Sequence, residues 1–345
     1  MRKNLARWIY AHSADLLGVI PYSWIRQLYR ETTILPFYHA VSDLSPPHLR
    51  YLYPIRSQVD FKRDLDFLLE HYEPVRPGDD LKSILPGRGP RQRFLLSFDD
   101  GLIECHRYIA PILEERNIQA VFFINTAFLD NRALFFRYKL SLILVKLNSV
   151  GVHDAALSEA RLVLGLKKKD DLSGKIMELK YDQEYLIDQL ADILNISFAD
   201  YLQKERPYMS IDQILDLHRR GFIVGAHSDD HPLYADLTKE EIIRQTKKSS
   251  EIMQTIVPED LKLFSFPFTD YCVGSDVIRR MKAEKIFDYC FGCAGLRLER
   301  EAFHLQRIPM ESGQKGARAL LSAQIVKFAL LRILGQEYIQ RNKWN

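Results

Sequence analysis

Residues 94–101 read FLLSFDDG, a short apolar run that ends in two adjacent carboxylates, Asp99 and Asp100, and a glycine. The run has the length and composition of a buried strand. In parallel α/β folds, ligands bind at the carboxyl ends of strands, so both acids are placed for chemistry. Two adjacent buried carboxylates repel each other, and a divalent cation that binds one while the other stays a free base relieves that repulsion. The alternative is an Asp-Gly turn whose acids are solvated.

Similar apolar runs recur along the chain and alternate with helical patterns, which is the rhythm of a parallel sheet or barrel wrapped by helices. Capping residues mark the start of several helices, among them Ser57 and the pair Ser210 and Gln213. The stretch from about 127 to 209 contains helical patterns but no strand, and we interpret it as a helical insertion. We expect strands over residues 34–38, 94–98, 120–124, 222–226, 261–266, 286–291 and 303–308.

A second polar cluster, GAHSDDHP over residues 225–232, follows another predicted strand. His227 and His231 are four residues apart and can reach one metal ion from a loop, because Pro232 disfavours helix at His231. Taken alone, two such histidines often have no function. Together with one carboxylate of the Asp99 and Asp100 pair they supply two nitrogens and one oxygen, which suits zinc with an open position for water.

Composition and charge limit the class of protein. The chain has 345 residues, 47% hydrophobic, 27% charged and only 4 Cys, which excludes a disordered, collagen-like or disulfide-framework protein. No apolar run approaches the roughly 20 residues that span a bilayer, and His12 and Asp15 interrupt the region where a signal peptide would be apolar, so we expect a cytoplasmic location. The net charge of +3 is concentrated as basic residues near both ends of a mildly acidic body, so we expect no nucleic-acid partner.

The two clusters resemble the motifs of a known family. Residues 97–101 are similar to the T/S-F-D-D-G motif, and residues 227–231 to the H-S/T-x-x-H motif, of polysaccharide deacetylases (carbohydrate esterase family 4, the NodB-homology domain). The resemblance covers residues 34–126 and 210–310. It implies an α/β fold, a distorted (β/α)7-type barrel, to which the residue patterns outside the resemblance add a helical insertion and helical N- and C-terminal extensions. We expect the N-terminal extension over residues 1–33, the barrel over 34–312 with its insertion at about 127–209, and a C-terminal helix over 313–345.

The resemblance also implies a reaction and the residues that perform it. Asp100, His227 and His231 would bind a divalent metal, for which we expect Zn²⁺, and Asp99 would be the general base. A water molecule activated by the cation and by Asp99 would attack the carbonyl of an N-acetyl group, giving acetate and a free amine. The predicted function is therefore a metal-dependent hydrolase that removes acetyl groups from N-acetylated sugars or glycans, a carbohydrate N-deacetylase.

Three further residues are assigned by the same resemblance. The third family motif, R-x-P-Y or a Y-P-Y variant, corresponds to FSFPF at residues 264–268, where the arginine is absent but the backbone amide of Phe268 can still donate to an oxyanion. YHAV at residues 38–41 resembles the element that opens the rearranged, poly-N-acetylglucosamine deacetylase branch, so His39 is the expected general acid. Arg307 aligns with a late basic position that pairs with the base. The alternatives are a histidine satisfied at a strand end and a surface arginine.

Other interpretations remain open at this point. A catalytically degenerate glycan-binding protein would explain the missing arginine and the relocated acid, and a facial-triad iron oxygenase would use the same three ligands, although it needs no base such as Asp99. The expected partner is an N-acetylated glycan or a lipid-linked sugar. The basic, apolar terminal segments, including a long helix at about 317–339, can lie on the inner face of a membrane or pack on the barrel or a second subunit. The oligomeric state is left open.

Overall fold

The chain forms a closed parallel barrel in the computed structural model, which describes residues 20–29, 33–84, 92–150, 153–311, 313 and 315–341. An 8-stranded sheet has the order β10-β9-β8-β7-β6-β5-β2-β11, and every pairing is parallel. Both faces of a wrapped parallel sheet are buried, which explains why the strands are apolar runs. The strands are β2 (Pro36–Tyr38), β5 (Leu96–Phe98), β6 (Ala120–Ile124), β7 (Ile223–Ala226), β8 (Leu263–Ser265), β9 (Tyr289–Gly292), β10 (His304–Gln306) and β11 (Ile308–Pro309).

The barrel closes within a single extended segment. β10 pairs with β9, and β11, which follows after Arg307 alone, pairs with β2 at the other end of the sheet. The Arg307 N–H still donates to Gly292 O of β9 (3.1 Å), whereas the next N–H, of Ile308, donates to Leu35 O (2.8 Å). β10 and β11 thus form one continuous strand of the barrel, whose neighbouring strand changes from β9 to β2 at Arg307. With β10 and β11 counted as one strand, each of the seven predicted apolar runs forms one strand of the barrel. The predicted seven-stranded barrel is confirmed.

A small second sheet lies at the amino ends of two barrel strands, β2 and β5. Its strands β1 (Thr33–Ile34), β3 (Glu73–Pro74) and β4 (Arg93–Phe94) are parallel in the order β1-β4-β3. The predicted strands 34–38 and 94–98 are therefore each divided, at Leu35 and Leu95. The Leu95 N–H donates to Ile34 O (3.1 Å), so the two chain segments stay paired through the break.

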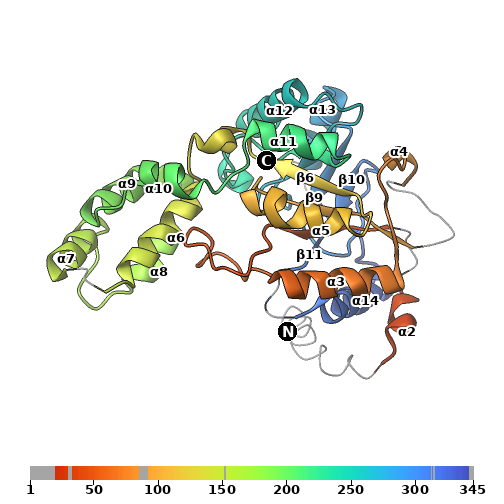
Figure 1. Cartoon of the computed structure of the whole chain (residues 1–345), viewed down its shortest axis with the longest axis horizontal. Coiled ribbons are helices and arrows are strands. Elements are labelled where there is room, and N and C mark those ends of the chain that lie inside the picture. Colours follow the sequence, from red (N-terminus) through yellow and green to blue (C-terminus); the bar gives the residue numbers. More distant parts are fainter. Residues whose placement is uncertain are drawn as a thin grey trace.

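Helices cover the outside of the barrel (Figure 1). The predicted caps are present, because Ser57 accepts from the Asp60 N–H and Ser210 forms a complete capping box with Gln213. Thr238 also caps a helix, accepting from the Glu241 N–H. The covering elements are α2 (Tyr22–Arg26), α3 (Gln58–His71), α4 (Leu81–Ile84), the π-helix η1 (Cys105–Ile109), α5 (Ala110–Glu114), α11 (Ile211–Arg219), the 3₁₀ turn η4 (Tyr234–Asp236), α12 (Lys239–Ile256), α13 (Ser275–Ala283) and α14 (Ala317–Ile333).

The chain between β6 and β7 forms a helical lobe on the left of Figure 1, and the predicted helical insertion is confirmed. The lobe has its own apolar core, which includes Leu140, Ile176 and Leu190 and continues to Leu49 and Leu102 of the barrel. This shared core attaches the lobe to the barrel. Its helices are η2 (Thr126–Asn131), α6 (Phe136–Leu147), α7 (Asp154–Val163), α8 (Leu172–Met177), η3 (Tyr181–Gln183), α9 (Glu184–Ile193) and α10 (Phe198–Glu205).

The C-terminal helix is shorter than expected. α14 ends at Ile333 rather than near residue 339, because Gly335 adopts a left-handed conformation (φ 63°) just past its end. α14 packs against α2 and α3, which favours its predicted role in covering the barrel. The first 19 residues of the basic, apolar N-terminal segment lie outside the described residues. Among the residues that are described, no helix is both long and apolar enough to cross a bilayer.

Candidate active site

The predicted site residues lie at the carboxyl ends of the barrel strands. His39 follows β2, the pair Asp99 and Asp100 follows β5, and His227 follows β7. Ladder hydrogen bonds hold two of these positions, since the Asp99 N–H donates to Tyr38 O (3.1 Å) and the His227 N–H to Ile124 O (2.9 Å). Parallel strands end at the same edge of a barrel, so residues far apart in the chain meet there.

Unusual backbone conformations turn the ligand side chains inward. Asp100 has φ 72° and His231 has φ 59°, in the left-handed region that most side chains avoid. The His231 turn is held by its own N–H, which donates to the Ser228 hydroxyl at 3.2 Å. Such conformations cost about 1–3 kcal/mol each and are typical of functional sites.

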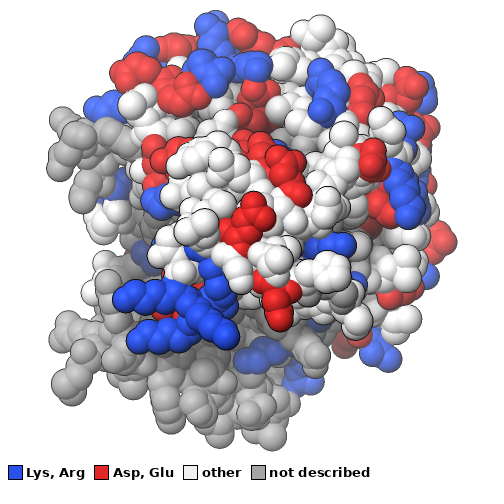
Figure 2. Space-filling model, turned by 90° about the vertical axis from the view of Figure 1, so that its left-hand side faces the viewer, with Lys and Arg blue, Asp and Glu red and all other residues white. Residues whose placement is uncertain are grey.

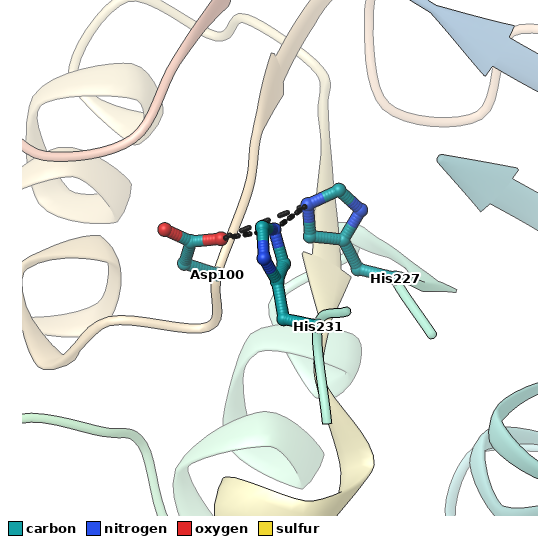
Figure 3. A group of neighbouring side chains, drawn as sticks. All are labelled: Asp100, His227 and His231. Carbon is teal, nitrogen blue, oxygen red and sulfur yellow. Dashed lines mark hydrogen bonds and ion pairs between the residues drawn. The ribbon is translucent and has the colours of Figure 1, made fainter. Parts of the chain in front are cut away.

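Asp100, His227 and His231 converge on one point (Figure 3). Asp100 Oδ1 lies 3.6 Å from His227 Nε2 and 3.4 Å from His231 Nε2, and the two Nε2 atoms are 3.2 Å apart. All three residues are buried, and their ligand atoms lie within 4.8 Å of one another. Two imidazole nitrogens and one carboxylate oxygen in this arrangement can bind a divalent metal ion.

The hydrogen bonding of Asp100 and the protonation of the two histidines fit a cation as well. Asp100 Oδ1 is buried and has no hydrogen-bond partner among the described residues, a costly state that a metal ion would remove. His227 Nδ1 donates to Ser265 O (2.8 Å), which leaves Nε2 as the unprotonated nitrogen facing the other ligands. Burial lowers the pKa of His227 to about 4 and that of His231 to about 3, so both are neutral near pH 7 and ready to coordinate.

The helical insertion contributes to the same centre through Tyr138 of α6. The Tyr138 hydroxyl donates to Asp100 Oδ2 (2.7 Å), so it orients the carboxylate whose other oxygen faces the histidines. No pattern in the sequence indicates this contact, because Tyr138 lies in the insertion, outside the family motifs. Partners of this kind usually set how well a metal is held.

Replacing Tyr138 with phenylalanine is expected to weaken zinc binding by roughly 10- to 100-fold, because Asp100 loses the donor that fixes its orientation. Competition with a chromogenic chelator measures the affinity. Tyr185→Phe is the matched control, since Tyr185 is an exposed tyrosine of the same lobe. If the zinc affinity of Y138F were within twofold of that of the control, other contacts would be holding Asp100.

Asp99 lies beside this centre and is paired with Arg307. Arg307 Nη1 and Nη2 donate to Asp99 Oδ1 and Oδ2, both at 2.7 Å, and Asp99 Oδ2 is 3.7 Å from His227 Nε2. Burial by itself raises the pKa of Asp99, but the guanidinium outweighs it and holds that pKa well below its usual range. Asp99 is therefore ionised and oriented, as a general base must be before it accepts a proton.

Arg307 is a buried residue and not a surface arginine of an edge strand. Its guanidinium also donates to the hydroxyls of Ser97 (3.0 Å) and Ser265 (2.6 Å) and lies 4.3 Å from the centre of the Phe37 ring. The charge is thus surrounded by acceptors and an aromatic face inside the closed end of the barrel.

His39 faces the same cavity and is paired with Glu311, a residue that the sequence interpretation missed. His39 Nδ1 lies 2.5 Å from Glu311 Oε2, and Glu311 Oε1 accepts from the backbone N–H of His39 (2.9 Å). Burial lowers the pKa of His39, but Glu311 outweighs it and raises that pKa to about 9. His39 is therefore protonated at neutral pH. Glu311 could have been found from its place just after the last strand, where functional residues collect.

All seven predicted site residues line one cavity of about 280 Å³. Phe268 forms part of its wall with φ 55°, and its ring centre lies 4.6 Å from that of His231. No acceptor for the Phe268 N–H is found among the described residues. The cavity is lined by Phe37, His39, Leu52, Tyr53, Asp99, Asp100, Phe135, Arg137, Tyr138, Met177, His227, His231, Phe266, Phe268, Cys293 and Arg307.

A comparison with protein families matches residues 169–284 to the model described as polysaccharide deacetylase. The matched stretch contains His227 and His231, begins inside the helical insertion, and leaves Asp99 and Asp100 upstream. No curated protein matches the sequence. The predicted resemblance to polysaccharide deacetylases is confirmed by this match.

Solved structures share the fold. The chain is similar to the deacetylase PplD of Streptococcus pyogenes in complex with acetate (TM-score 0.53, 12% identity, 86% of this chain and 99% of that chain). It is also similar to IcaB from Ammonifex degensii (0.52, 16%, 86% and 97%) and to the putative polysaccharide deacetylase BA0330 from Bacillus anthracis (0.51, 12%, 85% and 69%). At such low identities the similarity shows a common fold.

Proposed function

We propose that this chain is a metal-dependent carbohydrate N-deacetylase, which hydrolyses the amide of an N-acetylated sugar or glycan. The observation that carries the proposal is the convergence of Asp100, His227 and His231 in one cavity that also contains an ionised carboxylate, Asp99, and a protonated histidine, His39. These are the parts that amide hydrolysis needs: a cation site, a base and an acid. The family match and the shared fold support the same function.

Each residue has a defined part in the reaction. A divalent cation held by Asp100, His227 and His231 would polarise the acetyl carbonyl and acidify a water molecule, and the donor set favours Zn²⁺. Asp99 accepts the proton of the attacking water, and the Phe268 N–H donates to the oxygen that gains negative charge. His39 donates its proton to the amide nitrogen as the carbon–nitrogen bond breaks. The products are acetate and the free amine.

Acetate release from a panel of N-acetylated sugars and glycans tests the proposal. We expect release by the purified protein, loss of release after treatment with a chelator, and recovery on adding zinc. Intact metal binding without acetate release from any substrate would instead support the alternative of a glycan-binding protein. That alternative arose from the absent arginine and the relocated acid, but Arg307 contacts Asp99 and His39 lies in the same cavity.

The pH dependence of the reaction is expected to report His39. The general acid must be protonated, so kcat/KM should fall tenfold per pH unit above about pH 9, the pKa that Glu311 gives to His39. In Glu311→Gln, burial still lowers the pKa of His39 but the carboxylate no longer raises it. The alkaline limit should therefore move down by more than about one pH unit.

Glu301→Gln is the control for Glu311→Gln, because Glu301 is a carboxylate that precedes β10, pairs with Arg279 and is not part of the cavity lining. Its alkaline limit should equal that of the unmodified protein. An unchanged limit in both variants would remove His39 as the general acid. The iron oxygenase alternative is disfavoured because Asp99 and its arginine have no part in that chemistry.

The wider assignments are part of the proposal. We propose that residues 34–312 form the catalytic unit, with the insertion at about 127–209 shaping the substrate cavity through Tyr138 and Met177. Cytoplasmic location, contact with the inner membrane face and a lipid-linked substrate stay predictions. Figure 2 shows the face of the molecule at the left of Figure 1, where acidic and basic side chains are both present and one basic group gathers at the lower edge of the described surface. This mixed surface does not favour nucleic-acid binding at that face.

A further inference from the structure

Arg137 is a cavity residue that the proposed reaction does not use. It is the second residue of α6, and both Arg137 and the next residue, Tyr138, line the cavity. Its guanidinium carbon lies 5.8 Å from the centre of the Phe268 ring, and that ring is itself 4.6 Å from the His231 ring. The insertion therefore places a positive charge one aromatic ring away from the cation site.

This charge has no carboxylate partner among the described residues. The interactions of Arg137 are a hydrogen bond from Nη1 to Met177 O (3.1 Å) and contacts with the faces of Phe136 and Phe268. Its Nε is buried without an acceptor. A half-buried guanidinium is normally paired, because removing a charge from water costs several kcal/mol when nothing compensates it.

The carboxylates near the cavity are already engaged. Asp99 is paired with Arg307, Glu311 with His39, and Asp100 with Tyr138 and the two imidazoles. Arg137 is consequently left without a direct carboxylate partner. The three carboxylates match the charges of Arg307, His39 and Arg137, so a bound divalent cation would give the cavity an excess of positive charge. An uncompensated positive charge in a cavity attracts and orients an anionic ligand.

We propose that Arg137 binds an anionic group of the substrate, so that the preferred substrate is an N-acetylated sugar bearing a phosphate or a carboxylate rather than a neutral glycan. This inference rests on the proposed deacetylase function. A guanidinium presents a planar fork of N–H groups that fits the oxygens of phosphate and carboxylate. A neutral sugar makes no such pair with Arg137, so it gains none of this binding and the anionic sugar is preferred by the difference.

Steady-state acetate release tests the inference with three sugars of similar size: N-acetylglucosamine 1-phosphate, N-acetylmuramic acid with its carboxylate, and the neutral methyl glycoside of N-acetylglucosamine. The variants are Arg137→Gln, Arg137→Lys and the control Lys146→Gln, which removes a charge from an exposed position of the same helix. We expect the unmodified protein to prefer an anionic sugar, and R137Q to raise the KM for that sugar by roughly 10- to 100-fold.

The neutral glycoside and the conservative variant separate binding from a structural role. In R137Q the kcat for every sugar and the KM for the neutral glycoside should stay within about twofold of K146Q, and R137K should keep part of the preference because it keeps the charge. The two anionic sugars distinguish phosphate from carboxylate as the natural group. Equal loss on neutral and anionic sugars, or no preference in the unmodified protein, would overturn the inference.

A binding measurement separates this inference from the proposed function. Calorimetry measures the Kd of glucosamine 1-phosphate, which carries no acetyl group. We expect R137Q to raise this Kd by the same roughly 10- to 100-fold. If no sugar releases acetate but this difference in Kd is found, the deacetylase function fails and the anion site stands. If acetate is released and the Kd is equal in both proteins, the anion site fails and the function stands.

Discussion

Replacing Asp100 with asparagine is expected to abolish both metal binding and acetate release. Asparagine keeps the size of the side chain and an oxygen that can accept from Tyr138, but it removes the negative charge facing His227 and His231. The bound cation supplies several kcal/mol of transition-state stabilisation, so activity should fall by roughly a thousandfold or more. Metal content by mass spectrometry and acetate release measure the two effects on one preparation.

Thermal unfolding separates this effect from misfolding. Zinc should raise the Tm of the unmodified protein, because a ligand that binds only the folded state stabilises it, and should leave the Tm of D100N unchanged. Asp66→Asn is the control, since Asp66 is an exposed aspartate of α3 far from the cavity lining. Full zinc uptake or unimpaired acetate release by D100N would remove Asp100 from the metal site.

The second large effect is expected from Arg307→Met. Methionine fills much of the space of the arginine but leaves Asp99 and two serine hydroxyls without their buried donor. Breaking a buried ion pair by removing one partner costs about 3–5 kcal/mol in the free energy of unfolding. Burial then raises the pKa of Asp99 against only the remaining effects of His227 and His39, so the base should also be impaired and acetate release should fall with it.

The surface of the protein offers a matched control. Arg220 donates from Nε and Nη2 to the two oxygens of Glu114, both at 2.6 Å, which is also a two-bond pair but one with partial exposure to solvent. Arg220→Met should cost at most about 1 kcal/mol, because exposed ion pairs contribute little. Urea unfolding of the two variants measures the difference. Equal losses would mean that burial does not determine the strength of the Asp99 pair.

Two ion pairs inside the cavity, Arg307 with Asp99 and Glu311 with His39, explain how the protein folds with several charges there. Arg307 compensates Asp99 and Glu311 compensates His39, so each reacting group is held in the protonation state that it needs before substrate arrives. Groups fixed in advance need no reorganisation during the reaction. Arg137 differs because it has no such partner, which is why we assign it to the substrate and not to the reaction.

The sequence alone predicted the barrel, the insertion and seven residues that line the cavity. The strands could be predicted because parallel strands buried on both faces are apolar runs, as in residues 120–124. The position of the site could be predicted because Asp99 and His227 directly follow such runs, and strands of one barrel end together. Local patterns of a few residues carried both inferences.

Only the tertiary structure decided which further residues hold the predicted site residues in place. Glu311 pairs with His39 across 272 positions of the chain. This contact follows from closure of the barrel at Arg307, which brings the last strand of the barrel beside the first. Tyr138 and Arg137 reach the cavity because the insertion packs back on the barrel through a shared apolar core. No local sequence pattern predicts such long-range contacts, because they depend on how distant segments pack.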